Sequence, residues 1–167
     1  FFYRYAVILE DPAHAQAEQP KFDINVIASS TVGLCGEYHV VSGGSIPGFQ
    51  SYGSTRWKDW TVIGIDLTPF IGDTVAIEYT TYDCAQSGHY GYAYISCGCM
   101  ENNINVSYTP NYEQATLTVP TGFNYLWSSG GADTLQSITI NNPVFGSVYT
   151  CTLTSVTGCS FTLSTAL

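Results

Sequence analysis

Apolar and polar residues alternate with a period of two along much of the chain, the pattern of strands with one buried face. Phe22, Ile24 and Val26 share one face of such a segment, and Asp23 and Asn25 lie opposite. No helical period of 3.6 residues extends beyond a single turn near residues 66–70, which excludes a helical enzyme scaffold. Strands are predicted near residues 2–9, 21–28, 35–41, 59–65, 74–82, 89–96, 104–108, 115–119, 124–128, 136–140, 147–155 and 159–165.

The character of the chain changes near residue 100. All four basic residues and ten of the thirteen acidic residues precede Cys99. The later strands are short and regularly spaced by turn residues, which is typical of a small β-sandwich. We therefore expect two all-β domains, residues 1–99 and 100–167, with the boundary at residues 99–101.

The second predicted domain carries two immunoglobulin-like marks. Trp127 lies on the third predicted strand, where an indole would fill the space between two sheets, and Tyr149-Thr150-Cys151 has the spacing of a tyrosine corner. The second predicted strand, residues 115–119, has no cysteine to pair with Cys151. Any bridge of Cys151 must therefore run elsewhere than in an immunoglobulin domain.

Charge limits the partners that the chain can bind. Charged residues make up 10% of the chain, well below the about 25% of ordinary soluble domains. The net charge is −9, and no lysine or arginine follows Lys58. Such a surface cannot hold nucleic acid or anionic lipid by charge, so we expect uncharged partners.

The chain also lacks a segment that would insert into a membrane. No apolar run reaches the about 18 residues that a transmembrane helix needs. The first residues begin directly in a strand-like pattern without a signal peptide. We therefore expect an excised piece of a longer secreted protein.

An even set of six cysteines predicts disulfides formed in an oxidising compartment. The motif Cys97-Gly98-Cys99 is too tight for an ordinary zinc site. Sequence alone leaves the pairing open. We expect the bridges of the second domain among Cys97, Cys99, Cys151 and Cys159, which leaves Cys35 and Cys84 for each other.

Catalytic sets are not well formed in this sequence. Cys35, Glu37 and His39 share one strand face, but steps of about 7 Å are too long for direct proton transfer. Glu10 and Asp11 are adjacent, and nothing in the sequence assembles the cleft with two separated acids that a glycosidase uses. We therefore expect no enzyme activity.

Three acids suggest a cation site. Glu10 and Asp11 end one predicted strand and Asp83 ends another. If these ends meet, their carboxylates need a counterion, and Ca²⁺ takes such oxygen ligands. A solvated acidic rim is the alternative. A zinc site that uses His14 and His89 is a second alternative.

Three tyrosines form the candidate ligand-binding stripe. Tyr90, Tyr92 and Tyr94 alternate with Gly91 and Ala93, so their rings share one strand face. Exposed rings would stack on sugars, and the phenol hydroxyls would hydrogen-bond to them. The alternative is a stripe packed beneath a neighbouring sheet. The small residues opposite favour the exposed arrangement. The adjacent residue His89 completes this set of candidate ligand-binding residues.

Ordered sequence matches to one family cover nearly all of residues 1–99. The matching positions are residues 5–12, His14, and residues 18–20, 35–36, 45–49, 58–61, 65–67, 71–72, 83–84, 88–89 and 91–95. They resemble a module of the SprB-type gliding-motility adhesins, giant Bacteroidetes surface proteins exported by type IX secretion. Residues 100–167 are similar to the repeats of those proteins at Tyr125-x-Trp127-Ser128, 136–139 and 158–159.

The resemblance implies a jelly-roll β-sandwich followed by an immunoglobulin-like β-sandwich. It also implies a non-catalytic piece of an extracellular adhesin filament for surface attachment and gliding, with neighbouring domains and an extracellular surface or polysaccharide as partners. A calcium-assisted carbohydrate-binding module of a secreted protein is the main alternative. A passive spacer is the third.

Overall fold

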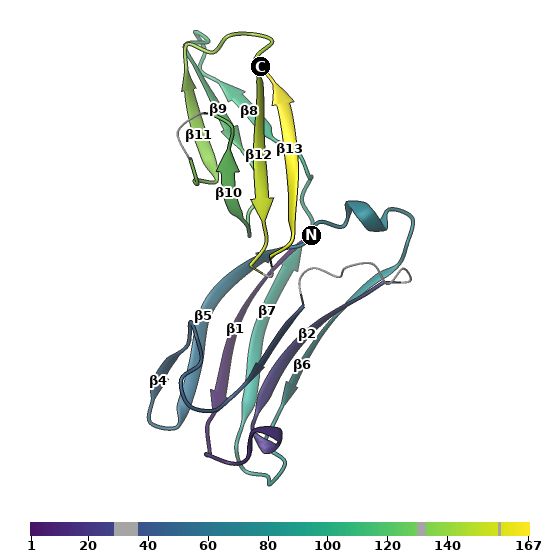
Figure 1. The fold of residues 1–167 in the computed structure, drawn as a ribbon, viewed down its shortest axis with the longest axis vertical. Helices are drawn as coiled ribbons and strands as arrows, with labels where there is room; N and C mark the ends of the chain where they lie inside the picture. The colour runs from purple at the N-terminus through teal and green to yellow at the C-terminus, as the bar shows by residue number, and fades with distance from the viewer. Residues whose placement is uncertain (29–36, 130–132, 157) are drawn as a thin grey trace. The chain divides into compact units, whose positions relative to one another are not determined.

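The computed structural model describes residues 1–28, 37–129, 133–156 and 158–167 of this chain. Its elements are antiparallel sheets and two short 3-10 turns, which confirms the predicted all-β class (Figure 1). The strands are β1 (Phe2–Glu10), β2 (Lys21–Ala28), β3 (Tyr38–Val41), β4 (Gln50–Tyr52), β5 (Thr55–Gly64), β6 (Val75–Tyr82), β7 (Gly91–Gly98), β8 (Asn105–Tyr108), β9 (Gln114–Thr118), β10 (Asn124–Trp127), β11 (Ser137–Asn141), β12 (Val148–Thr154) and β13 (Ser160–Ala166); the 3-10 turns are η1 (Gln16–Glu18) and η2 (Thr68–Phe70).

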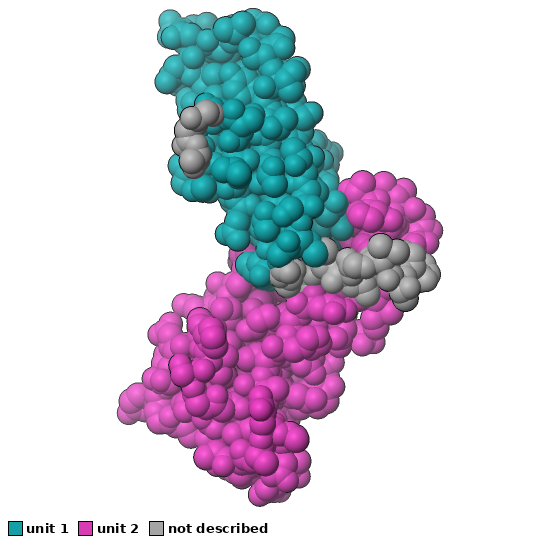
Figure 2. Space-filling model, in the orientation of Figure 1, with its two compact units in different colours: residues 1–2, 63–66, 98–167 teal, residues 3–62, 67–97 magenta. Residues whose placement is uncertain are grey.

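The chain divides into two compact units (Figure 2). Unit 2 comprises residues 3–62 and 67–97, and unit 1 comprises residues 1–2, 63–66 and 98–167. The main segment of unit 1 thus begins next to the predicted boundary. Two short segments from earlier in the sequence also belong to unit 1, because Gly64 N donates to Gly122 O at 2.9 Å and Ile65 N donates to Phe1 O at 2.9 Å.

Unit 2 is a sandwich of two sheets, with strand orders β4-β5-β1-β7 and β3-β2-β6. Alternate residues of β1 are buried, beginning with Tyr3 and Tyr5. The Tyr5 ring lies 5.5 Å from that of Phe22 on β2 and 5.3 Å from that of Tyr38 on β3. The Tyr3 ring lies 5.5 Å from that of Tyr79 on β6. Side chains from both sheets therefore meet in one aromatic core.

Unit 1 contains a second pair of sheets, with strand orders β10-β12-β13 and β11-β9-β8. Trp127, on the third strand after residue 100, is buried as expected, and its indole nitrogen donates to Leu135 O at 2.9 Å. Cys151 on β12 lies opposite Trp127 in the sheet and is also buried. The core of this unit includes Ile104, Ala115, Leu117, Val119, Trp127, Ile138, Cys151 and Leu153. The jelly-roll and immunoglobulin-like strand orders stay predictions.

One hairpin was not expected from the sequence pattern. Strands β4 and β5 pair antiparallel, with Gln50 opposite Trp57 and Tyr52 opposite Thr55. Gly53 adopts a φ of 56° at the turn between them. All three residues of β4 are exposed, so this edge strand has no apolar alternation by which it could be predicted.

A close backbone approach in unit 1 generates the first prediction. Gly122 has a φ of 97°, and a Cβ atom there would lie 2.5 Å from Gly64 N. Gly146 has a similar φ of 86°, but a Cβ atom there would meet nothing within 4 Å. Gly122→Ala should lower the free energy of unfolding by about 2–4 kcal/mol, because backbone strain and displacement of residue 64 add together.

The matched control Gly146→Ala should lower the free energy of unfolding by only about 1–2 kcal/mol, since only the backbone strain applies there. Urea denaturation of the two variants measures the difference. Equal losses of free energy of unfolding in the two variants would contradict the added cost of the close approach between residues 64 and 122.

Candidate functional site

The tyrosines of β7 alternate with the small residues Gly91 and Ala93, which lie on the other face of that strand. Gly91 is buried, and a Cβ atom on it would lie 2.6 Å from Tyr82 O and 3.1 Å from Leu9 Cδ2. Only a glycine allows this approach to the core. Because side chains alternate along a strand, Tyr92 and its neighbours at even spacing must face the solvent.

The stripe is exposed, and its rings are close together. The exposed fractions are 39% for Tyr90, 42% for Tyr92 and 58% for Tyr94. Ring centroids are 5.7 Å apart between Tyr90 and Tyr92 and 5.9 Å apart between Tyr92 and Tyr94. The phenol oxygen of Tyr90 lies 3.1 Å from Thr55 Oγ1, which fixes one end of the stripe. Packing beneath another sheet, the alternative considered above, does not occur.

Trp60 extends this surface on β5. Its indole is 51% exposed, and the guanidinium carbon of Arg4 lies 5.3 Å from the ring centroid. Arg4 is exposed between the buried Tyr3 and Tyr5, so Trp60 shares the outer face of the sheet with it. Strand β1 lies between β5 and β7. The axes of β5 and β7 are therefore about 10 Å apart across the sheet. We call Trp60, Tyr90, Tyr92 and Tyr94 the aromatic face.

Each of the four lysine and arginine residues contacts a ring or a carboxylate. Such contacts neutralise the cations or cover them with aromatic surface, so none stands alone as an anchor for an anionic partner. The contacts are Arg4 with Trp60 at 5.3 Å, Lys21 with Asp23 at 3.8 Å and with Tyr82 at 4.1 Å, Arg56 with Asp11 at 2.9 Å, and Lys58 with Phe49 at 5.8 Å.

Asp11 is saturated by protein donors. Its Oδ1 accepts from Ala13 N at 3.1 Å and from Gln19 Nε2 at 3.0 Å. Its Oδ2 accepts from Gly44 N at 3.0 Å and from Arg56 Nη2 at 2.9 Å. Burial by itself would raise the pKa of Asp11, but these hydrogen bonds and the charge of Arg56 together lower it. The carboxylate therefore holds the loop after β1 in place.

The predicted calcium site does not assemble from its three acids. Asp83 Oδ1 accepts from Gly91 N at 3.0 Å, and Glu10 Oε1 accepts from Ser54 Oγ at 3.4 Å. Among the described residues, Glu10, Asp11 and Asp83 form no cluster that could hold an ion. The Asp11 and Asp83 carboxylates instead accept from backbone amides of their own surroundings, and calcium binding at these acids stays a prediction.

A different group of metal-ligating residues comes together in unit 2. One ligand atom from each of His14, Cys84 and His89 lies within 4.8 Å of the others. Cys84 Sγ lies 3.1 Å from His89 Nδ1. The His14 and His89 ring centroids are 5.0 Å apart. The sequence placed the two histidines in one alternative site but assigned the thiol to a disulfide.

The cysteines do not follow the predicted pairing. Cys84, Cys97, Cys99 and Cys151 are free thiols, so neither a Cys35–Cys84 bridge nor a bridge among the last three is present. Cys35 itself lies outside the described residues. Cys151 is enclosed in the core of unit 1, and burial raises the pKa of its thiol. It packs there as a small apolar side chain.

Of the three residues considered for catalysis, the structure describes Glu37 and His39. His39 Nδ1 lies 3.2 Å from Asp23 Oδ1 across the β2–β3 pair, and this histidine is exposed. Glu37 is exposed, and Cys35 belongs to a stretch that the structure does not describe. Nothing in this pairing supplies a nucleophile.

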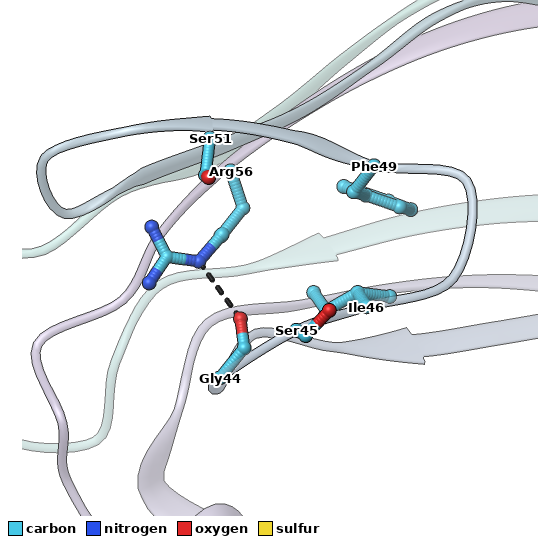
Figure 3. A pocket seen from close by; sticks show the side chains of 6 residues that line it. All are labelled: Gly44, Ser45, Ile46, Phe49, Ser51 and Arg56. Carbon is cyan, nitrogen blue, oxygen red and sulfur yellow. Dashed lines mark hydrogen bonds between the residues drawn. The ribbon is translucent and has the colours of Figure 1, made fainter.

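A pocket of about 220 Å³ lies beside the β4–β5 hairpin (Figure 3). The Arg56 guanidinium at its edge is already engaged, since Nε donates to Gly44 O at 3.0 Å and Nη2 donates to Asp11. The remaining lining is two serines, a glycine and two apolar side chains, which offers no acid–base pair. The lining residues are Gly44, Ser45, Ile46, Phe49, Ser51 and Arg56.

Comparison with known proteins identifies no relative. No family model matches this chain, and no curated protein or solved structure matches it either. The described residues contain no helix long and apolar enough to cross a membrane.

The Asp11 interactions predict an acid-sensitive stability. Because the folded-state pKa of Asp11 is lowered from 3.8, its contribution is present above that value and is lost as the pH falls through the folded pKa. Asp11→Asn should lower the free energy of unfolding by about 3 kcal/mol at neutral pH, since it leaves the half-buried Arg56 without its counterion.

The variant should also lose less stability than the parent between about pH 5 and pH 3. The control Glu113→Gln alters an exposed acid, so both its stability and its pH profile should match the parent. Denaturant unfolding across this pH range is the measurement. An acid profile unchanged by Asp11→Asn would contradict the role given to this carboxylate.

Proposed function

We propose that this chain is a non-catalytic binding segment of an extracellular adhesin, and that the aromatic face contacts uncharged polysaccharide. The exposed tyrosine stripe carries the proposal. Tyr90, Tyr92 and Tyr94 present ring surface and hydroxyl groups side by side, at centroid spacings of 5.7 and 5.9 Å. Sugar rings offer matching apolar faces and hydroxyl groups.

Electrostatics supports a neutral target. The chain has a net charge of −9, and each of its basic side chains is already in contact with an acid or an aromatic ring. An anionic polymer would meet like charge without an exposed cationic patch to hold it. A neutral polymer carries no charge and is not repelled by this surface.

The open shape of the surface favours weak and repeated contacts. The aromatic face lies on the outer side of a sheet, where a ligand keeps one side in solvent. A single contact of this kind is weak, but copies along one filament raise the effective concentration and strengthen attachment. This matches the adhesin function implied by the resemblance to gliding-motility proteins, together with export by type IX secretion to the cell surface.

A dedicated carbohydrate-binding module is the second candidate, and the separate pocket beside the β4–β5 hairpin favours it. Ser45 and Ser51 bring hydroxyl groups to that pocket, and Phe49 brings a ring. A module of this kind would bind one glycan specifically and saturably. The adhesin function predicts weaker binding across several neutral polysaccharides.

The test is binding of the full chain to immobilised neutral glucans, galactans and mannans, with alginate as the anionic comparison. Tyr92→Ala should weaken binding to the neutral polymers about tenfold, which corresponds to about 1.4 kcal/mol, because a stacking surface is removed. Tyr82→Ala is the matched control, since Tyr82 is equally exposed at 42% but lies on the opposite sheet.

The control variant should bind as the parent does. Absence of binding to every neutral polymer would favour a passive spacer and reject the proposal. Equal losses in the Tyr92 and Tyr82 variants, or stronger binding to alginate, would contradict the role of the aromatic face.

A further inference from the structure

We propose that His14, Cys84 and His89 form a binding site for a thiophilic divalent metal ion, with Zn²⁺ as the best match. Their ligand atoms lie within 4.8 Å of one another. Two imidazoles and one thiolate form a donor set that suits zinc and its analogue cobalt, whereas calcium and magnesium prefer oxygen ligands. The site shares no residue with the aromatic face, although His89 directly precedes Tyr90, and it does not depend on the function proposed for that face.

The loop between β6 and β7 holds two of the three ligands. Cys84 N donates to His89 O at 3.1 Å, and Ser87 N donates to Cys84 O at 3.2 Å. Ser87 and Gly88 both adopt positive φ angles, 65° and 91°, which close the loop tightly. The turn thereby brings the thiol of Cys84 and the imidazole of His89 to 3.1 Å from each other.

The segment between β1 and β2 supplies the third ligand. Gln19 Nε2 donates to His14 O at 3.3 Å, and the same amide also donates to Asp11, which anchors the start of this segment. Glu18 O accepts from Ala85 N at 3.0 Å, so the segment is tied directly to the β6–β7 loop. Both loops lie at the same end of unit 2 (Figure 1).

One buried polar atom of this cluster has no hydrogen-bond partner among the described residues. His14 Nδ1 is buried and makes no hydrogen bond among the described residues. Buried polar atoms without partners are rare and call for an explanation, such as an ion. Cys84 is a free thiol that is only 6% exposed, so a large substrate could not reach its sulfur. The arrangement therefore favours a bound ion over a catalytic cysteine.

The three ligand atoms need to move only slightly closer together to coordinate an ion. Zinc binds thiolate sulfur at about 2.3 Å and imidazole nitrogen at about 2.0–2.1 Å, so ligand atoms of a tetrahedral site lie roughly 3.3–3.6 Å apart. Binding replaces the thiol proton of Cys84 with the metal, and the proton passes to the buffer. Three protein ligands leave the fourth position for water or an external ligand.

Cobalt titration of the reduced full chain tests this site directly. One equivalent of Co²⁺ should produce a sulfur-to-cobalt charge-transfer band and the strong visible bands of four-coordinate cobalt, and Zn²⁺ should abolish both. Cys84→Ser should remove the charge-transfer band. His14→Ala and His89→Ala should each weaken metal affinity by at least about 100-fold, since loss of an indirect partner alone costs about 10–100-fold.

Two control variants leave the cluster intact. Cys97→Ser removes an exposed thiol of the same unit, and His39→Ala removes an exposed imidazole, so both should keep the full spectrum and affinity. A spectrum without sulfur ligation, or one lost equally in Cys97→Ser, would overturn the proposal. So would unchanged affinity in His14→Ala.

A measurement on the unaltered chain covers the case in which a variant fails to fold. Zinc should slow alkylation of Cys84 and leave alkylation of the exposed Cys97 and Cys99 unchanged, as followed by mass spectrometry of peptides. Equal alkylation of Cys84 with and without zinc would reject the site.

Discussion

The packing of two sheets around one aromatic core determines what unit 2 displays. Tyr3 and Tyr5 of β1 meet the rings of the opposite sheet, so every second residue of the strand is buried. The same alternation on β7 encloses Gly91 and turns Tyr92 outward. Because strand pleating couples the two faces, the aromatic face is a direct consequence of how the core is filled.

The Asp11–Arg56 pair serves the structure of unit 2. Asp11 and Arg56 pair at the start of the loop that leads to His14, and the same carboxylate accepts from the Gln19 side chain. The loop that results lies beside the β6–β7 connection, which carries Cys84 and His89. A partly buried ion pair thus helps to bring together residues that are distant in sequence, while the outer face keeps its uncharged rings.

Much of the fold could be predicted from local pattern, whereas the sites depended on tertiary contacts. Period-two alternation located most strands, and the small residue Gly91 indicated correctly that the tyrosines face outward. The polar edge strand β4 has no such alternation. The Cys84–His89 contact and the protein donors of Asp11 arise from turns and long-range hydrogen bonds, which no strand pattern records.

The central claim is that the outer face of β7 is the binding surface. Nuclear magnetic resonance mapping of the full chain during titration with a neutral oligosaccharide tests it most directly. The account predicts that the ring resonances of Tyr90, Tyr92 and Tyr94 shift together, while those of Tyr82 on the opposite sheet stay in place. Shifts confined to the opposite sheet, or to the pocket that contains Phe49, would contradict it.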